Sequence, residues 1–525
     1  YDLGTISNVY IANPGTYSAE IKGATNFALS SNVTGGTITP YKVWKANEDQ
    51  ILYGSDPGAD DNFGHAVAVD GNYAVVGSRY NDTGGTDRGA AFIFHKSGGT
   101  WTEQAMVQPS DTADNDWFGR GAAISGDYVI VNAYAKTTNN TGQGAAYIFY
   151  RSGTSWAQQA KLNASDSEAG DAYSFSVDID GDYAIVGALN EDPGGTSDAG
   201  SAYIYVRSGT SWSQQAKIQA SDKEAGDNFG RGVTISGDYA AVGAGQEDTT
   251  ASNAGSVYIF KRSGTSWSQQ QKIQSSDAEA DDTFGGGAGQ GVSLSGDYLA
   301  VGARTEDTGG SQAGSVYIFK KASGSETWSQ EAKLQASDVS AASQFGMSVS
   351  LSGTTLAVGA NAEDTAASDA GAAYIFERSG TTWTEVKKIT ASDTQASDYF
   401  GESISTDGTT TFVGAFGEDT NGASAGAAYV YEKTPIAELT FDNYNQLSLT
   451  NTPTYTSSKL AYYSNVYDIG TLTSDITIEK QGEYASLTFD TSSNVAYFSS
   501  VTVDAIASTQ AGYGADTIIY GTVQS

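Results

Sequence analysis

Apolar and polar positions in the middle of the chain alternate in short runs and show no helical period. One stretch shows the whole pattern: residues 232–236, 239–244 and 255–260 are rich in Val, Ile, Tyr and Ala, and a fourth run opens at Trp267. Runs of this length and composition are typical of β-strands. Gly-Asp and Ser-Gly pairs between them suit tight hairpin turns. The pattern therefore predicts a four-stranded antiparallel meander.

This unit recurs seven times at intervals of 55 to 61 residues. An aromatic residue followed by a small one opens each copy, and the longest interval contains extra residues between Gly285 and Gly291. The opening pairs are Phe63-Gly64, Phe118-Gly119, Tyr173-Ser174, Phe229-Gly230, Phe284-Gly285, Phe345-Gly346 and Phe400-Gly401. Meanders repeated in this way and arranged radially form a β-propeller. We expect one with seven four-stranded blades.

Tryptophans indicate how the ring closes. In six copies a tryptophan opens the fourth run, 17 residues before the next opening pair. These are Trp101, Trp156, Trp212, Trp267, Trp328 and Trp383. The seventh copy ends at Lys433 without such a run, whereas Trp44 stands 19 residues before Phe63. We expect residues 41–53 to supply the missing strand, the alternative being that Trp44 belongs to a flanking domain.

The flanks do not follow the repeat. They are rich in Thr, Ser, Tyr and Asn and contain alternating apolar positions, which predicts strands. We expect an all-β chain in which both termini build one β-sandwich-like domain. Residues 1–40 would form the N-terminal part of this β-rich anchoring domain, 41–433 the propeller, and 434–525 the C-terminal anchoring or assembly part.

Composition excludes several kinds of site. The chain has no cysteine and only two histidines, so disulfides, thiolate metal sites and multi-histidine metal sites are excluded. With 61 acidic against 27 basic residues the net charge is −34, which argues against a nucleic-acid partner. No apolar run approaches the roughly 18 residues of a membrane span, so we expect no membrane insertion.

Acidic pairs recur in the loops between the second and third strands. Meander geometry places these loops on the same rim as the loops between blades, which are also acidic, and places a set of basic residues on the opposite rim. The pairs are our candidates for partner binding: Glu191, Asp192, Glu247, Asp248, Glu306, Asp307, Glu363, Asp364, Glu418 and Asp419. The basic set is Lys96, Arg151, Arg207, Arg262, Lys321, Arg378 and Lys433. An acidic rim can serve solubility, or it can hold Ca²⁺ through carboxylates and loop carbonyls; we assign no cofactor and leave calcium as the alternative.

The opening Phe-Gly pairs, with the later Gly187-Ala188, Gly243-Ala244, Gly302-Ala303, Gly359-Ala360 and Gly414-Ala415, resemble FG-GAP repeats. This resemblance covers residues 41–433 and implies the propeller of integrin α-subunit heads, where partners dock on the face of the loops named above. The calcium loop of such repeats, D-x-D-x-D-G-x-x-D, is missing here. Only Asp178, Asp180 and Asp182 are similar to it, so we do not carry the family's calcium sites over.

Catalysis is not expected. A Ser-His-Asp arrangement could use only His65 or His95, and we expect both to be packing or surface residues. The repeated "SGTSW" turn lacks the aspartate of the sialidase Asp-box. Acids that recur in most blades indicate a structural use, because catalysis needs a unique site. For the same reason we expect the recurring Tyr and Trp residues to pack between blades.

The segments 1–10 and 467–476 resemble each other and short modules of marine phage structural proteins, cyanophages in particular. The resemblance implies a virion-surface structural or adhesion protein: a fibre, spike or capsid-decorating protein. A secreted or cell-surface bacterial adhesin is the alternative, and a glycan-processing enzyme is the third. Expected partners are other virion or surface proteins at the terminal domain, a host receptor or glycan on the acidic face, and further copies of the chain.

Overall fold

The computed structural model describes residues 9–11, 18–21, 38–45, 47–137, 142–287, 289–439, 483–490, 495–505 and 515–524. The one helical element among them is the 3-10 turn Pro193–Gly195. In this described part, no helix is long and apolar enough to cross a membrane. Contacts divide the chain into two compact units, Asn47–Glu432 and a second made of Tyr1–Ala46 with Lys433–Ser525.

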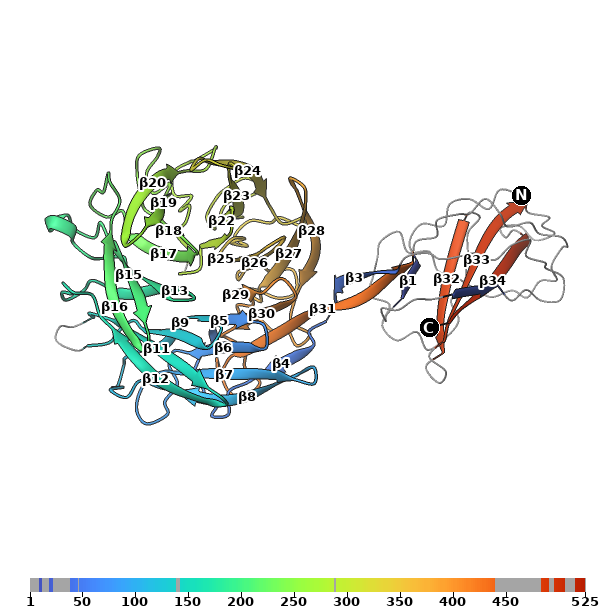
Figure 1. The fold of residues 1–525 in the computed structure, drawn as a ribbon, viewed down its shortest axis with the longest axis horizontal. Helices are drawn as coiled ribbons and strands as arrows, with labels where there is room; N and C mark the ends of the chain where they lie inside the picture. Colours follow the sequence, from blue (N-terminus) through green and yellow to red (C-terminus); the bar gives the residue numbers. More distant parts are fainter. Residues whose placement is uncertain are drawn as a thin grey trace. The chain divides into compact units, whose positions relative to one another are not determined.

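The larger unit is a ring of seven antiparallel sheets (Figure 1). Blade 1 contains β5 (Phe63–Asp70), β6 (Tyr73–Ser78), β7 (Ala90–Ser97) and β8 (Thr100–Val107), and blade 2 contains β9 (Phe118–Ser125), β10 (Tyr128–Ala133), β11 (Ala145–Ser152) and β12 (Ser155–Leu162). Blade 3 contains β13 (Tyr173–Asp180), β14 (Tyr183–Ala188), β15 (Ser201–Ser208) and β16 (Ser211–Ile218), and blade 4 contains β17 (Phe229–Ser236), β18 (Tyr239–Ala244), β19 (Ser256–Ser263) and β20 (Ser266–Ile273). Blade 5 contains β21 (Val292–Ser295), β22 (Tyr298–Ala303), β23 (Ser315–Lys321) and β24 (Trp328–Leu334), and blade 6 contains β25 (Ser348–Ser352), β26 (Thr355–Ala360), β27 (Ala372–Ser379) and β28 (Thr382–Ile389). The sequence prediction of four-stranded blades in a propeller is confirmed.

Blade 7 joins the two ends of the propeller. It contains β29 (Ser403–Thr406), β30 (Thr410–Ala415), the start of β31 (Ala427–Leu439) and, as fourth strand, β4 (Gln50–Leu52). Trp44, at the end of β3 (Ile38–Trp44), pairs with Lys433, as Trp212 pairs with Arg207 in blade 3. An N-terminal strand therefore closes the ring, as the tryptophan spacing predicts.

The smaller unit contains strands from both termini. β2 (Ser18–Ile21) pairs with β34 (Ala515–Gln524), which continues through β33 (Val495–Ala505) to β32 (Glu483–Asp490) in one antiparallel sheet. β1 (Val9–Ile11) pairs with the end of β31. Strands from both flanks therefore pair with one another among the described residues, and the β-sandwich-like arrangement stays a prediction. The phage-like segment 467–476 and residues 1–8 lie outside the described residues.

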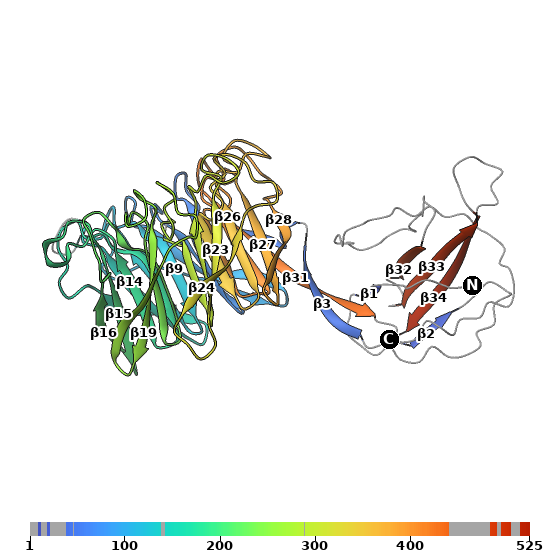
Figure 2. The ribbon, with the colours of Figure 1, turned by 90° about the horizontal axis from the view of Figure 1, so that it is seen from above.

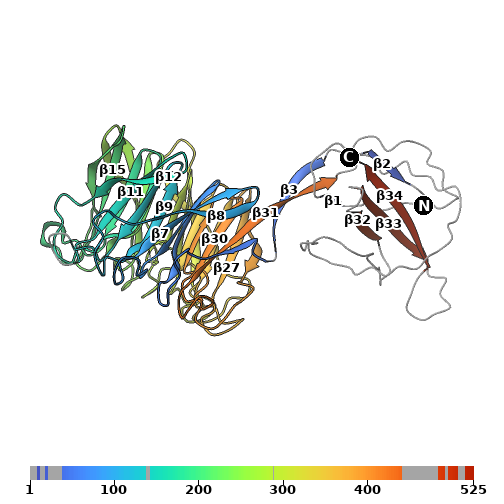
Figure 3. The same cartoon turned by 90° about the horizontal axis from the view of Figure 1, so that it is seen from below.

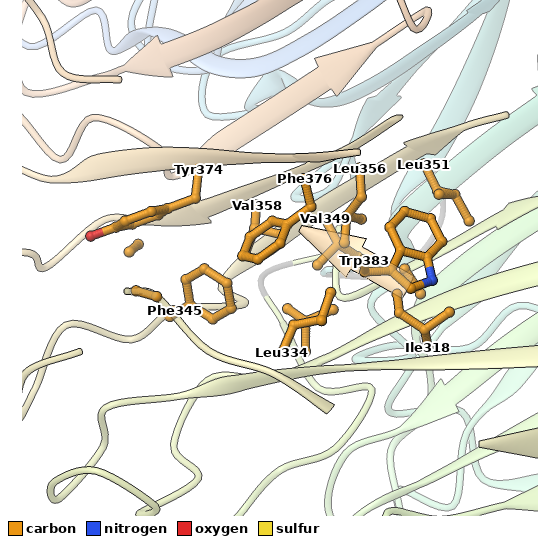
Figure 4. Close-up of a cluster of buried hydrophobic side chains, with 14 of the residues drawn as sticks. Ile318, Leu334, Phe345, Val349, Leu351, Leu356, Val358, Tyr374, Phe376 and Trp383 are labelled. Atoms are coloured by element: carbon orange, nitrogen blue, oxygen red, sulfur yellow. The ribbon is translucent and has the colours of Figure 1, made fainter. Parts of the chain in front are cut away.

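The core lies between blades. Each opening aromatic packs against two aromatic residues of the third strand in its own blade, and the strands of the preceding blade cover the cluster. Figure 4 shows one example, where Phe345 meets Tyr374 and Phe376 at ring-centre distances of 5.4 and 6.0 Å, beside Ile318 and Leu334 of blade 5. Burying one such side chain contributes about 1.5–3 kcal/mol. Seen from its edges in Figures 2 and 3, the ring is a disc crossed by the strands of each blade.

Candidate functional site

The acidic pairs do not present ten carboxylates to solvent. Their five glutamates are buried, with exposed fractions of 0 to 7%. In blade 3, Ser201 donates to Glu191 at 2.6 Å and the Lys217 ammonium lies 2.7 Å from the same carboxylate. Burial alone would lower the pKa of Lys217, but its bonds to Asp166 and Glu191 raise it. The glutamates of blades 3 to 6 thus fasten the 2–3 loop to the fourth strand, and those of blades 3 to 5 fasten it to the third strand as well.

The aspartates of the pairs are exposed and cap their own loops. Asp192 accepts a hydrogen bond from the backbone N–H of Asp198 at 2.8 Å, and the same bond recurs one blade after another. The equivalents are Asp248 with Asn253, Asp307 with Gln312, Asp364 with Asp369, and Asp419 with Ser424. Partner binding by the ten residues stays a prediction, and the aspartates are the members that a partner could reach.

The basic residues near the 3–4 turns form contacts between blades. Arg207 pairs with Asp182 of its own blade and stacks on Tyr128 of the preceding blade, 4.5 Å from the ring centre. Trp212 meets the same tyrosine at 6.0 Å. The arrangement recurs at Arg151, Arg262 and Arg378, each stacked on a tyrosine of the preceding blade. The expected packing role of the recurring Tyr and Trp residues is confirmed.

The family's calcium loop does not fit this chain. The first and second strands are joined by two-residue turns such as Gly181-Asp182. Of the residues similar to that loop, Asp178 accepts bonds from the N–H groups of Ile235 and Ile179, both at 2.8 Å, and Asp182 pairs with Arg207. Among the described residues, no three His, Asp or Glu side chains are grouped so as to hold a metal.

A small pocket opens where the first strands of the blades meet around the ring axis. His65, Arg120, Phe175 and Glu402 line it, and each stands two residues after the opening aromatic of its blade. Because this position differs from blade to blade, the pocket is asymmetric. About 20 Å³ is open to the centre of a water molecule. That is room for about one water molecule, so the pocket has space only for a group of about that size.

The residues inserted in blade 5 close one side of this pocket. Gln290 accepts a hydrogen bond from the N–H of Ile404 in blade 7 at 3.1 Å through its side chain. Its backbone carbonyl accepts one from Val349 of blade 6 at 2.9 Å. The insertion that makes the longest repeat interval therefore reaches across the axis.

The pocket is rich in arginine. Arg120 donates to the carbonyl of Phe175 at 3.0 Å, and Arg79 donates to Asn62 at 3.0 Å and to Nε2 of His65 at 2.7 Å. Since arginine only donates, His65 carries its proton on Nδ1, which donates to the carbonyl of Arg120 at 3.0 Å. Burial, followed by the charges of Arg79 and Arg120, lowers the pKa of His65 well below its ordinary value.

Two further guanidinium groups face the same region. Arg231 donates to the carbonyl of Gly286 at 2.8 Å, and Arg304 donates to the side chain of Gln344 at 2.9 Å while its buried Nε has no partner. All these acceptors are uncharged. Burial lowers the pKa of Arg120 to about 10, with Arg79 and Arg231 contributing. Burial also raises the pKa of Glu402, against the pull of Arg120, Arg79 and Arg304.

Half-buried aromatic rings continue from this cluster. Phe175 meets Tyr134 at 5.6 Å, and Tyr134 stacks on Trp117 at 6.2 Å. On the other side, Phe416 stacks on Tyr399 at 5.0 Å and lies 5.6 Å from the Arg79 guanidinium. Sequence reasoning assigned His65 to packing and did not single out the arginines. The available signal was the position two residues after each opening aromatic, where the residue type varies among the blades and is arginine in two of them.

Curated sequences and solved structures give no argument about the activity of this chain. Among curated protein sequences, none matches this chain significantly. Among solved structures, the Pseudomonas aeruginosa periplasmic gluconolactonase PpgL is 14% identical, with a TM-score of 0.44 over 73% of this chain and 98% of its own. Saccharomyces cerevisiae Sqt1 is 7% identical, with a TM-score of 0.41 over 74% of this chain and 99% of its own. At these scores we draw no conclusion from either.

The family comparison is specific. The FG-GAP repeat model matches seven segments that together cover more than half of the chain, and each runs from the fourth strand of one blade to the third strand of the next. The segments are 46–94, 101–149, 156–205, 212–260, 267–319, 328–376 and 383–431. The first begins in the N-terminal segment that closes the ring, and the matches end within β31. This chain belongs to the FG-GAP repeat family.

Proposed function

We propose that this protein is a non-enzymatic interaction module that recognises a carboxylate group of its partner at the axial pocket. The observation that carries the proposal is that Arg120 lines this pocket and that Arg79, Arg231 and Arg304 lie next to its lining residues His65, Phe175 and Glu402, in a chain of net charge −34. Guanidinium groups bind carboxylates strongly through charge-assisted hydrogen bonds. Glu402 is the one acid lining the pocket, and its partner is Asn361 at 2.7 Å.

Electrostatics favour a partner that presents one acid. The exposed aspartates of the 2–3 loops repel an extended acidic surface, while the axial arginines attract a single carboxylate. The limited room in the pocket favours the end of an acidic side chain or of an acidic sugar. Repeated acids serve the blades internally, whereas each of these arginine positions is occupied by arginine in two blades: Arg120 and Arg231 share the position two residues after the opening aromatic, and Arg79 and Arg304 share the position after the second strand.

Isothermal titration calorimetry with N-acetylglutamate amide and with glucuronate tests this recognition. The two probes distinguish an acidic side chain from an acidic sugar as the source of the carboxylate. We expect Arg120→Gln to weaken binding of the preferred probe at least tenfold, the loss of one charge-assisted hydrogen bond worth about 1.5–3 kcal/mol. Arg207→Gln, which removes an arginine paired at the opposite rim, should leave binding unchanged. Equal losses in both variants, or no binding of either probe by the folded wild type, would contradict the proposal.

We also propose that the terminal β-unit holds the propeller on a larger assembly, with the surface of a phage particle as the first placement. Both ends of the propeller pass through blade 7, because β4 and β31 are neighbours in its sheet. Such a module can be displayed without interrupting the ring. Density-gradient fractionation tests the placement: the protein should band with nuclease-protected DNA. Recovery with cell envelopes or in the soluble fraction would favour a bacterial adhesin.

A further inference from the structure

A lysine of the fourth strand neutralises two acids at the same place in blades 3 to 6. In blade 3, the Lys217 ammonium lies 2.8 Å from Asp166 and 2.7 Å from the buried Glu191. The equivalents are Lys272 with Asp222 and Glu247, Lys333 with Asp277 and Glu306, and Lys388 with Asp338 and Glu363. A buried carboxylate is costly without such a partner, so this lysine is a structural part of the blade.

Blade 7 keeps the two acids without the lysine. Its acids are Asp393 and Glu418, and Tyr429 donates to Asp393 at 2.8 Å as Tyr203 donates to Asp166. The register pairs Tyr429 with Ile51, as it pairs Tyr203 with Lys217. Ile51 therefore stands where the other blades have their lysine.

Glu418 has also lost its serine partner, as has Glu363 of blade 6, which keeps its lysine and likewise has an unpartnered Oε2. The residue paired with the end of the second strand is Ser201 in blade 3 and Ala427 in blade 7. Glu418 is 0% exposed, its Oε1 accepts from the N–H of Thr420 at 2.7 Å, and its Oε2 has no partner. The buried Oδ1 of Asp398 likewise has none. Two unpartnered oxygens thus lie at this corner of the blade.

The other exceptions in the ring support this comparison. Blade 1 has neither the buried glutamate nor the lysine: Asn81 stands in place of the glutamate and Met106 in place of the lysine. In blade 2, Lys136 replaces the glutamate and pairs with Asp116 at 2.7 Å. Blade 7 is therefore the one blade of the described ring in which the buried glutamate remains and its cation does not.

We propose that blade 7 binds a calcium ion between Asp393 and Glu418, where the other blades place the lysine ammonium. The donors are the two carboxylates and the Thr420 hydroxyl, whose equivalent Thr249 lies 2.8 Å from the Lys272 ammonium in blade 4. These are all oxygen atoms, which hard cations prefer. Ca²⁺ tolerates an irregular donor set, whereas Mg²⁺ demands a near-octahedral one.

At this location the ion would stabilise the closure of the ring. Asp393 and Glu418 come from loops near the C-terminal end of the propeller, whereas Ile51 belongs to the N-terminal strand β4 and Tyr53, which bonds to Thr420, directly follows it. β4 has three residues against the seven or eight of the other fourth strands. An ion at this corner would fasten the shortest fourth strand to its blade and so stabilise the ring closure.

Terbium luminescence provides the direct test, because Tb³⁺ substitutes for Ca²⁺ and is sensitised by tyrosines such as Tyr53 and Tyr429. The wild type should give sensitised emission that Ca²⁺ displaces, and its melting temperature should rise by several degrees from EDTA to millimolar Ca²⁺. Ile51→Lys restores the ammonium and should lose both responses while staying folded in EDTA. The matched variant Lys388→Ile recreates the blade 7 arrangement in blade 6, where Ala372 already stands in place of the serine, and should gain a second calcium response.

The proposal fails if the wild type melts at the same temperature in EDTA and in Ca²⁺. It also fails if folded Ile51→Lys gives the same terbium emission as the wild type. Should Ile51→Lys not fold, Glu418→Gln replaces it, and undiminished Tb³⁺ binding by that variant overturns the site. If Mg²⁺ displaces Tb³⁺ as effectively as Ca²⁺, the assignment to calcium is wrong. None of these readouts depends on the axial pocket, so they are independent of the proposed function.

Discussion

At the scale of single residues, the Phe-Gly and Gly-Ala pairs of the repeat both supply small residues to the same contact between adjacent blades. The glycine of each Gly-Ala pair packs on the backbone of the opening pair in the next blade. A Cβ on Gly302 would lie 2.1 Å from the carbonyl oxygen of Gly346. The one departure is compensated: Asn132 takes the glycine's place in blade 2, and its side chain donates to the carbonyl of Ser174 at 2.6 Å. A change at one position therefore requires a change at the other.

Gly302→Ala should consequently be costly. The overlap is with backbone, which cannot move without shifting a neighbouring blade, so we expect a loss of about 2–4 kcal/mol in unfolding free energy. Gly296→Ala is the control: that turn glycine has φ +58° and no atom within 4 Å of its Cβ position, so its cost is about 1–2 kcal/mol of backbone strain. Urea denaturation measures both, and equal losses would show that the contact between blades is not the reason.

At the scale of the strand, hydrogen bonds between outer strands tie adjacent blades together. The indole of Trp267 donates to Gln215 of the preceding blade at 2.9 Å, as Trp212 does to Gln159. Both partners are half-buried, so the bond contributes about 0.5–1.5 kcal/mol. A double-mutant cycle with Trp267→Phe and Gln215→Ala should return a coupling energy in this range. A coupling of zero would mean that the outer strands are held by the buried aromatic clusters alone.

Repetition explains what could be predicted from sequence. Seven copies of one pattern made the strands, blade number and closure by the Trp44 segment readable, because deviations in single copies average out. The inward orientation of the glutamate side chains was not predictable, because their partners lie on other strands of the blade. Ser201 on the third strand and Lys217 on the fourth both contact Glu191. The axial pocket was not predicted for the opposite reason: the position that lines it carries His65, Arg120, Phe175 and Glu402 in four blades and so follows no common pattern.

At the scale of the whole molecule, the acidic excess coexists with carboxyl groups held in unfavourable surroundings. Asp227, Asp282 and Asp398 occupy one repeated position in the loops between blades, and burial raises the pKa of each to about 6, with a neighbouring glutamate adding to the shift. Burial raises the pKa of Asp178 to about 6 as well, despite its bonds to backbone N–H groups. A second set of carboxyl groups has a lowered pKa. At Asp166 and Asp222 burial raises the pKa, but the hydrogen bonds from a lysine and a tyrosine lower it by more.

These two sets predict a stability maximum in weak acid. A carboxyl group whose folded pKa is raised contributes stability below its unfolded pKa, near 3.8, and loses it as the pH rises through about 6. Groups with a lowered pKa lose their contribution as the pH falls below about 4. The melting temperature at constant ionic strength should therefore rise from pH 7.5 to about pH 5 and fall below pH 4. Asp178→Asn should flatten the rise, because the buried amide has no charge to lose. A melting temperature that falls steadily from pH 7.5 would show that the ion pairs outweigh the buried acids throughout.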